Sequence, residues 1–288
     1  MKNLEQITEP IRTELAQFET FFEQTLKADT APMDSIMRYV LETTGKRLRP
    51  MLVLLSAKLF GEINERTLRA AIFVEMIHSA TLIHDDVVDD SDLRRDKASV
   101  KAQFGNLSAV LAGDYLLSKA LLLIANDTAI LNEMLHTTVA MSEGELMQNA
   151  VGLSDHGSRN GNHPRSDRYD ENPEMGLPQC DSPTDQYLEI ITRKTALLMR
   201  SCCVAGAISV DATEEQIQQI ADFGLNFGIL FQLRDDILDA DNAETIAFAK
   251  QLLPEYLQNT KESLQPFPHS ETLEALQELT AFCAGRTK

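Results

Sequence analysis

Residues 81–95, TLIHDDVVDDSDLRR, place a run of acidic residues at the end of an apolar, helix-compatible stretch. On a helix, Asp85 and Asp89 are four residues apart and project from one face. Carboxylates this close repel each other, and a hard cation such as Mg²⁺ relieves the repulsion. Arg94 and Arg95 follow, and their planar guanidinium groups suit phosphate oxygens. The stretch therefore predicts a helix that carries a metal-assisted diphosphate site.

An acidic run on a helix is usually a solvated surface, and the first stretch alone does not exclude that interpretation. A second stretch, FQLRDDILD at residues 231–239, repeats the aspartate spacing among apolar residues, which a solvated face would not need. Two such stretches, far apart in the chain, can face each other across a cavity and hold several metal ions. Both stretches are therefore candidate metal sites, with Asp85 and Asp89 on one face of the first.

The composition limits the class of protein. The 288 residues are 43% hydrophobic, enough for one large domain with a substantial core. The formal net charge of −18 argues against nucleic-acid binding, since no basic stripe offsets phosphate repulsion. Cys180, Cys202, Cys203 and Cys283 show no metal-binding or redox spacing, and we see no signal peptide, so we expect a cytoplasmic protein with reduced thiols. No run approaches the length of a membrane span.

Apolar residues recur at steps of three and four along most of the chain, which predicts an all-α fold without strands. The expected helices cover 4–26, 67–90, 108–126, 131–151, 187–210 and 214–240. Residues 151–183 hold four glycines and four prolines with little apolar content, so we expect a mobile insertion there. We interpret residues 1–288 as a single domain.

A cluster of cations lies in GKRLRP, residues 45–50, at an expected junction between helices. Lys46 and Arg49 belong to this cluster. One interpretation is a cap that complements the dipole at the end of a helix. The other is a second anion site.

Three further polar residues gain their meaning only from the aspartate segments. His78 lies two turns before the first segment, where a buried core histidine is the more ordinary interpretation. Lys194 and Thr195 lie in an expected helix and, taken alone, would be surface residues. The occurrence of all three with two aspartate segments favours a binding role.

In their order and spacing, these motifs resemble the trans-isoprenyl diphosphate synthase family, in its polyprenyl branch. The motifs are GKRLRP, EMIHSATLIHDDVVDDSDLRR, GDYLL, GE followed by Gln148, Tyr187 to RKTA, and FQLRDDILD. The resemblance covers about residues 30–150 and 185–240. It implies a single large helical bundle around a central cavity, a homodimer, and Mg²⁺ as cofactor. The metal ligands that it implies are Asp85, Asp86, Asp89, Asp235 and Asp239.

The resemblance implies that isopentenyl diphosphate condenses with an allylic diphosphate to give a medium- or long-chain polyprenyl diphosphate. Metal and cations stabilise the departing diphosphate, and the neighbouring double bond attacks the allylic cation that remains. The residues expected to act in catalysis are Asp85, Asp89, Lys194 and Asp235. Contacts to the allylic diphosphate are expected from Arg94, Lys194, Thr195 and Gln232, and contacts to isopentenyl diphosphate from Lys46, Arg49, His78 and Arg95.

The expected product length follows from the residues before Asp85. The growing chain would run from the metals along the helix toward its N-terminus. Thr81 and Ala80 are small, at positions where short-chain members of the family commonly have an aromatic residue. We therefore expect a product longer than geranylgeranyl diphosphate. The alternative is that Ala80 simply packs against a neighbouring helix.

The chain departs from the family pattern in ways that bear on activity. Asp96 stands where the family usually has glycine, which adds negative charge beside an anion site. After Asp239 the usual lysine- and glycine-rich segment is missing, so the region after 239 is shortened. The alternative function is therefore a catalytically impaired relative that binds ligand or regulates a heteromeric synthase. A terpene cyclase fits less well, because FQLRDDILD supplies aspartates where cyclases use other residues.

Overall fold

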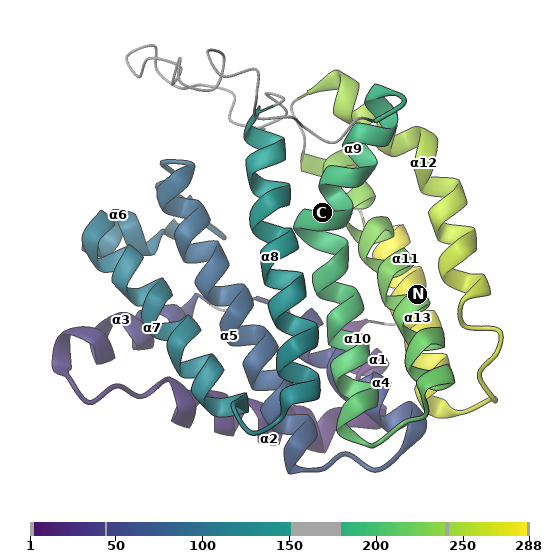
Figure 1. Ribbon diagram of the computed structural model, residues 1–288, viewed down its shortest axis with the longest axis horizontal. Helices are drawn as coiled ribbons and strands as arrows, with labels where there is room; N and C mark the ends of the chain where they lie inside the picture. Colours follow the sequence, from purple (N-terminus) through teal and green to yellow (C-terminus); the bar gives the residue numbers. More distant parts are fainter. Residues whose placement is uncertain (1–2, 44, 151–179, 240–241, 287–288) are drawn as a thin grey trace.

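The computed structural model describes residues 3–43, 45–150, 180–239 and 242–286 (Figure 1). Over these ranges the chain is a bundle of helices with one short hairpin, which confirms the expected all-α fold. The first half contains α1 (Leu4–Ile7), the 3₁₀ turn η1 (Glu9–Ile11), α2 (Arg12–Leu26), α3 (Ala31–Glu42), α4 (Leu48–Phe60), α5 (Glu65–Val88), α6 (Val100–Phe104) and α7 (Asn106–Ile124). The remainder contains α8 (Thr128–Ala150), α9 (Pro183–Ile191), the turn η2 (Thr192–Ala196), α10 (Leu197–Ser209), α11 (Glu214–Asp239), α12 (Ala243–Glu262) and α13 (Glu271–Gly285).

The first expected helix is interrupted, so the expectation of one continuous helix over 4–26 is wrong. The chain instead forms α1, η1 and α2. Pro10 lies inside η1, and proline has no backbone N–H to continue an α-helix. The apolar spacing survives the break, because Ile7, Ile11 and Phe18 are all buried.

Helix α5 carries the first aspartate segment. Asn64 caps its start: the side-chain oxygen accepts a hydrogen bond from the backbone N–H of Thr67 at 3.1 Å, as part of a capping box. The body of the helix is buried on nearly every side. The helix ends at Val88, and Asp90, with a φ of 53°, turns the chain away. These limits place the first aspartates in the last turn.

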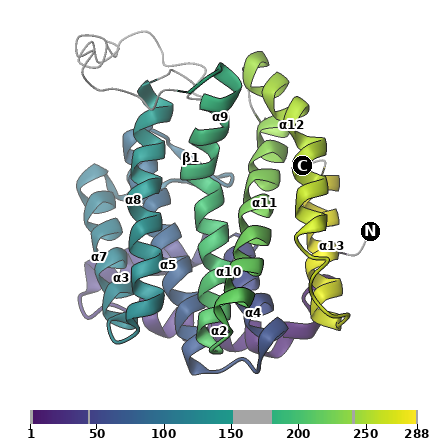
Figure 2. The ribbon, with the colours of Figure 1, turned by 45° about the vertical axis from the view of Figure 1, so that its right-hand side comes forward.

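Helix α10 lies inside the bundle, in contact with α4, α5, α8 and α11 (Figure 2). Its approach to α4 needs a glycine, because a Cβ at Gly206 would collide with the backbone carbonyl of Val53. Helix α4 is itself buried from Pro50 to Ala57, as its apolar sequence predicts. This packed centre positions α5 and α11, the two helices that carry the aspartate segments.

The expected helix over 187–210 is two helices joined by a π-helical turn, η2. The turn packs closely on α11, where a Cβ at Gly228 would collide with the backbone of Ala196. Single π turns inside helices are frequent at functional sites. This one contains Lys194 and Thr195.

A short antiparallel hairpin follows α5, against the expectation of no strands. Strand β1 (Leu93–Arg94) pairs with β2 (Lys97–Ala98). Arg95 and Asp96 form the turn with φ values of 53° and 62°. Positive φ at both central residues is typical of the two-residue turns that match strand twist. Strands of two residues show no alternation of polarity, which is why the sequence did not predict them.

Two expectations concern the surface. The insertion expected at 151–183 lies outside the described residues except for 180–183. Among the described helices, α7 is long and apolar enough to cross a membrane, and 33% of that stretch is buried. The expectation that no run reaches this length is therefore too strong. One such helix is weak evidence for a span, because core helices of soluble proteins pass the same test.

Candidate functional site

The two aspartate segments meet at one cavity. Asp85 from α5 and Asp235 from α11 both line a hollow of about 510 Å³. Met141 and Phe231 provide part of its apolar wall. The other polar residues that line it include Arg49, Thr81, Arg94, Glu145, Asn149, Lys194, Thr195 and Gln232. The fold thus brings together carboxylates that are remote in the chain.

A second hollow, of about 340 Å³, adjoins the first, since both are lined by Asp85 and Lys194. Asp89 lines this second hollow, so both aspartates of the expected helical pair face a cavity. Thr245 of α12 lines it too, and its hydroxyl is buried without a hydrogen-bond partner. Helix α12 therefore closes part of the site.

The donor set fits a hard divalent cation. Among the described residues, no three His, Cys, Asp or Glu side chains already form a metal-binding group. Asp85 and Asp89 instead reach the hollows from α5, and Asp235 reaches them from α11. Mg²⁺ prefers carboxylate oxygens, takes only one or two of them, and completes its shell with water and substrate phosphates. Because the carboxylates come from two separate helices, the cavity between them leaves room for this water and phosphate.

The surroundings of Asp85 disfavour its ionised carboxylate. Burial, reinforced by the nearby carboxylate of Glu145, raises the pKa of Asp85 from 3.8 to about 7. Lys194 opposes this shift, but its ammonium group pairs with Glu145 at 2.6 Å. A cation bound at Asp85 would stabilise its ionised carboxylate and offset the repulsion from Glu145.

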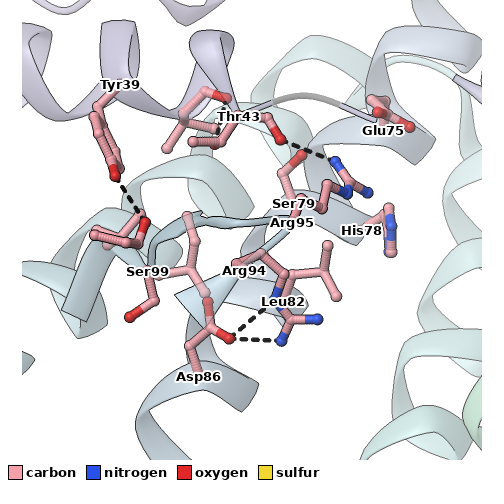
Figure 3. Close-up of a pocket in the computed structure, with 14 residues that line it drawn as sticks. Tyr39, Thr43, Glu75, His78, Ser79, Leu82, Asp86, Arg94, Arg95 and Ser99 are labelled. Atoms are coloured by element: carbon pink, nitrogen blue, oxygen red, sulfur yellow. Dashed lines mark hydrogen bonds and ion pairs between the residues drawn. The ribbon is translucent and has the colours of Figure 1, made fainter. Parts of the chain in front are cut away.

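The second aspartate of each segment is held by hydrogen bonds to its neighbours. Asp86 is 3% exposed, and its Oδ1 accepts bonds from Nε and Nη2 of Arg94 at 3.0 and 2.6 Å (Figure 3). Asp236 is 7% exposed and accepts bonds from the Tyr187 hydroxyl and from Nε2 of Gln232, the latter at 2.7 Å. Asp86 was expected among the metal ligands. In the structure its carboxylate is instead bound by Arg94.

The first and last aspartates of the second segment differ in their surroundings. Asp235 forms an ion pair with Arg286, which follows α13. The guanidinium carbon of Arg286 also lies 5.0 Å from the centre of the Phe231 ring. Asp239 is the exposed last residue of α11 and lines none of the hollows described above. The sequence did not predict the role of Arg286, because this arginine lies outside every motif and has no repeated spacing that would indicate a site.

Lys194, Thr195 and Gln232 lie together, as the sequence predicts. The Thr195 hydroxyl donates to Oε1 of Gln232 at 2.9 Å, and the Gln232 amide in turn donates to Asp236. Together with the ion pair between Lys194 and Glu145, these bonds connect η2 to both α8 and α11. The role of Glu145 was not foreseen, although it lies in the quoted GE motif.

A basic hollow of about 550 Å³ adjoins the 510 Å³ cavity of Asp85 and Asp235, which we call the acidic cavity. It contains the four residues expected to contact isopentenyl diphosphate: Lys46, Arg49, His78 and Arg95. It shares Arg49, His78 and Phe231 with the 510 Å³ cavity. The Nε atoms of Arg49 and Arg286, which both line it, are buried without hydrogen-bond partners. Unpaired guanidinium N–H groups in a basic hollow fit an anion with several oxygens.

His78 is 8% exposed and acts as a neutral partner of Arg49. Its Nε2 lies 2.8 Å from Nη1 of Arg49. Because a guanidinium group can only donate, Nε2 accepts and the ring proton is on Nδ1. Burial, together with the charges of Arg49, Arg95 and Arg94, lowers the pKa of His78 well below its ordinary value. His78 therefore orients Arg49 rather than adding positive charge.

The middle cation of GKRLRP, Arg47, has a structural role. It is 8% exposed and donates to Glu19 at 2.8 and 3.0 Å and to Glu75 at 2.7 Å. Its guanidinium carbon lies 4.5 Å from the centre of the Phe22 ring. Burial opposes the charge of Arg47, but the two glutamates outweigh it and raise its pKa. The three cations of this motif are therefore not equivalent.

The hairpin turn directs the paired arginines to different partners (Figure 3). Arg94 reaches Asp86, whereas Nη1 of Arg95 donates to the carbonyl of Thr43 at 3.0 Å. A Cβ at Gly45 would collide with the Arg95 guanidinium, so glycine at this position makes room for that side chain. The local fold thus explains both the glycine of GKRLRP and the place of Arg95.

The chain matches the family described as polyprenyl synthetase over residues 30–253. It belongs to that family. This polyprenyl synthetase-family chain is 34% identical to heptaprenyl diphosphate synthase component 2 of Geobacillus stearothermophilus, over 80% of its own length and 65% of that protein. It is 31% identical to octaprenyl diphosphate synthase of Escherichia coli, over 82% and 66% of the two chains. The chain thus spans less than two thirds of the length of these relatives.

Solved structures support the fold of this polyprenyl synthetase-family chain. A polyprenyl synthase from Caulobacter crescentus, solved in complex with calcium and isoprenyl diphosphate, superposes with a TM-score of 0.81 over 99% of this chain and 98% of the other. A decaprenyl diphosphate synthase from Rhodobacter capsulatus superposes with a TM-score of 0.79 over 99% of each chain. The sequence identities are 24% and 22%, so these likenesses concern the fold alone.

Proposed function

We propose that this protein is a Mg²⁺-dependent trans-prenyltransferase that condenses isopentenyl diphosphate with an allylic diphosphate. The observation that carries the proposal is the shared cavity of Asp85 and Asp235, with a basic hollow beside it. The allylic diphosphate needs metal ions, which the carboxylates of the first cavity would hold. Isopentenyl diphosphate needs only cationic side chains, which the basic hollow provides. Membership of the polyprenyl synthetase family supports the same reaction class.

In this proposal the allylic diphosphate binds in the acidic cavity. Asp85, Asp89 and Asp235 would hold Mg²⁺, which when bound neutralises negative charge on the diphosphate leaving group. Arg94, Lys194, Thr195 and Gln232 complete the grip on the diphosphate. Lys194 would exchange its contact with Glu145 for phosphate oxygens, and Asp239 would join the metal shell only through rearrangement of the end of α11.

Isopentenyl diphosphate binds in the basic hollow, where Lys46, Arg49 and Arg95 meet its phosphates and His78 fixes Arg49. Cleavage of the allylic C1–O bond leaves a cation, which the double bond of isopentenyl diphosphate attacks. A proton is then lost, and the released diphosphate is its acceptor. No protein nucleophile is required, so the residues of this chain act by binding, orientation and charge stabilisation.

We further propose a product longer than geranylgeranyl diphosphate. Thr81 lines the 510 Å³ cavity, and its small side chain leaves that wall open. Ala80 is 3% exposed in the main core, so it contributes mainly by packing, as the alternative interpretation held. A Thr81→Phe variant is expected to shorten the product, which mass spectrometry of the reaction mixture would detect.

The proposed assembly is a cytoplasmic, single-domain homodimer. Helices α7 and α8 contact each other and expose large apolar side chains: Leu107, Leu111, Leu122, Leu135, Val139 and Leu146. Apolar patches of this kind mark interaction surfaces, and a second copy of the chain fits the family resemblance. Light scattering should give twice the mass of one chain, and Leu122→Glu combined with Val139→Glu should give a monomer.

A second candidate function is a catalytically impaired partner in a heteromeric synthase. Two observations favour it: a relative 34% identical to this chain is named as a component of heptaprenyl diphosphate synthase, and α12 begins only a few residues after Asp239. In the described structure Lys250 and Lys261 of α12 are exposed, so neither replaces the missing lysine in the cavity.

One assay separates the candidates. Purified protein is incubated with Mg²⁺, farnesyl diphosphate and labelled isopentenyl diphosphate, with an Asp85→Asn variant and an excess of chelator as controls. Labelled products longer than geranylgeranyl diphosphate, absent from both controls, support the synthase. Metal-dependent binding of both diphosphates without any product supports the partner function instead.

A further inference from the structure

Arg286 occupies a place that none of the motifs account for. It follows α13, yet its guanidinium group pairs with Asp235 and its side chain is 15% exposed. The same side chain lies over the Phe231 ring and lines the basic hollow. One of its N–H groups, on Nε, is buried without a hydrogen-bond partner. The side chain thus connects the acidic cavity with the basic one.

The backbone at residue 286 is tethered to the second aspartate segment. Nε of Arg234 donates to the carbonyl oxygen of Arg286 at 2.7 Å, and Nη2 of Arg234 donates to the same atom. Arg234 directly precedes Asp235 in FQLRDDILD. Arg234 of the motif therefore holds the backbone of Arg286, and the side chain of Arg286 neutralises Asp235 of the same motif.

We propose that Arg286 is an internal counter-cation of Asp235, which gives up the carboxylate when a divalent cation binds there. This rests on the proposed function, since it takes Asp235 as a metal ligand. A guanidinium group and a divalent cation both neutralise the same carboxylate, so their binding is competitive. After release, the tether to Arg234 keeps Arg286 in the basic hollow, where its unpaired N–H and that of Arg49 meet diphosphate oxygens.

The test is Mn²⁺ binding to substrate-free protein, measured by electron paramagnetic resonance of the free ion. Arg286→Gln is expected to bind Mn²⁺ about tenfold more tightly than the unmodified chain, a coupling of ordinary size. Arg286→Lys, which keeps the charge, should stay near the unmodified value. Arg12→Gln, which removes a surface ion pair with Glu9, is the matched control and should change nothing. Adding Asp235→Asn to Arg286→Gln should abolish the gain.

A purely structural role for Arg286 predicts the opposite sign, because loosening the site would weaken metal binding. Unchanged or weaker Mn²⁺ affinity in a folded Arg286→Gln variant would overturn the proposal. Should that variant unfold, Arg234→Gln releases the same backbone and is expected to tighten Mn²⁺ binding too. No change there would be equally decisive. The readout needs no turnover, so a chain that binds Mn²⁺ as expected but forms no product contradicts the proposed function alone.

Discussion

The two aspartate segments have the same spacing, yet their leading carboxylates differ in charge balance. Asp85 lies near Glu145, and its pKa is raised to about 7. Asp235 is neutralised by Arg286, which reaches it from beyond α13. The second aspartates, by contrast, are similar: Asp86 and Asp236 are both buried and hydrogen-bonded. The spacing therefore places the first aspartate of each segment at a cavity and the second in a buried hydrogen bond, while distant parts of the chain set the charge balance of each first carboxylate.

The largest expected effect is on turnover. Asp85 lines both the 340 Å³ and the 510 Å³ hollows, whereas Asp235 lines only the larger of the two. We expect Asp85→Asn to lower kcat about 10³-fold and Asp235→Asn about 10²-fold, within the range for lost charge stabilisation. Steady-state kinetics with saturating Mg²⁺ would measure both. Equal losses would contradict the claimed difference between the segments.

The next largest effect is on the stability of the metal-free protein, where the contact that holds Asp86 can be compared with the one that holds Asp236. Arg94→Gln leaves the buried carboxylate of Asp86 without its ion pair and is expected to cost about 3 kcal/mol of unfolding free energy. Tyr187→Phe removes one neutral donor from Asp236, which keeps its bond from Gln232, and should cost about 1 kcal/mol. Urea unfolding of the three proteins would measure these values. If Tyr187→Phe lost more unfolding free energy than Arg94→Gln, the contact with Asp236 would be the stronger of the two, contrary to this prediction.

A third prediction concerns the sign of stability changes with pH. The folded-state pKa of Asp85 lies above its unfolded value, so the contribution of this group to stability is present at low pH and is lost as pH rises through about 7. In chelator at pH 8, Asp85→Asn should therefore raise the unfolding free energy by about 2 kcal/mol, after discounting for solvent screening.

The matched variant is Asp235→Asn, which leaves Arg286 without its ion pair. It should lower the unfolding free energy by about 1 kcal/mol under the same conditions. At pH 5 the gain from Asp85→Asn should be much smaller than at pH 8, because the Asp85 carboxyl group is then protonated in the folded chain. Thermal and urea unfolding at both pH values would check this, and a gain independent of pH would contradict the stated cause.

The smallest expected effect comes from the hairpin turn. Asp96 has a φ of 62°, a backbone conformation that glycine adopts without steric cost. Asp96→Gly should stabilise the chain by at most about 1 kcal/mol. It should also lower the KM for isopentenyl diphosphate about twofold, since one negative charge is removed next to Arg95, which lines the basic hollow. Asp96→Asn, which removes the charge but keeps a side chain of the same size at the same position, is the control for charge alone.

The sequence predicted the helices well, because apolar periodicity and caps are local. The limits expected for α5 and α11 agree with the structure to within two residues. It also predicted the residues that share the cavities, since the spacing of Asp85 and Asp89 and the apolar context of Asp235 are physical requirements of a buried acidic site. What it could not predict depends on contacts between remote segments.

Arg286 illustrates that limit, because nothing near it in the sequence indicates that it reaches Asp235. Asp86 illustrates another: a helix places consecutive aspartates on different faces, yet the motif alone does not say which face meets Arg94. Pro10 did carry a local warning, and the periodicity of its neighbours concealed it.

The π turn at Thr192–Ala196 has a consequence for redesign of the site. On an α-helix, neighbouring residues diverge by about 100°, yet Lys194 and Thr195 both line the acidic hollows. Removing one residue from this turn would restore regular winding and rotate α9 about its axis relative to α10. A one-residue deletion would thus redirect the ammonium group of Lys194, and the buried residues of α9 would have to repack around the new direction.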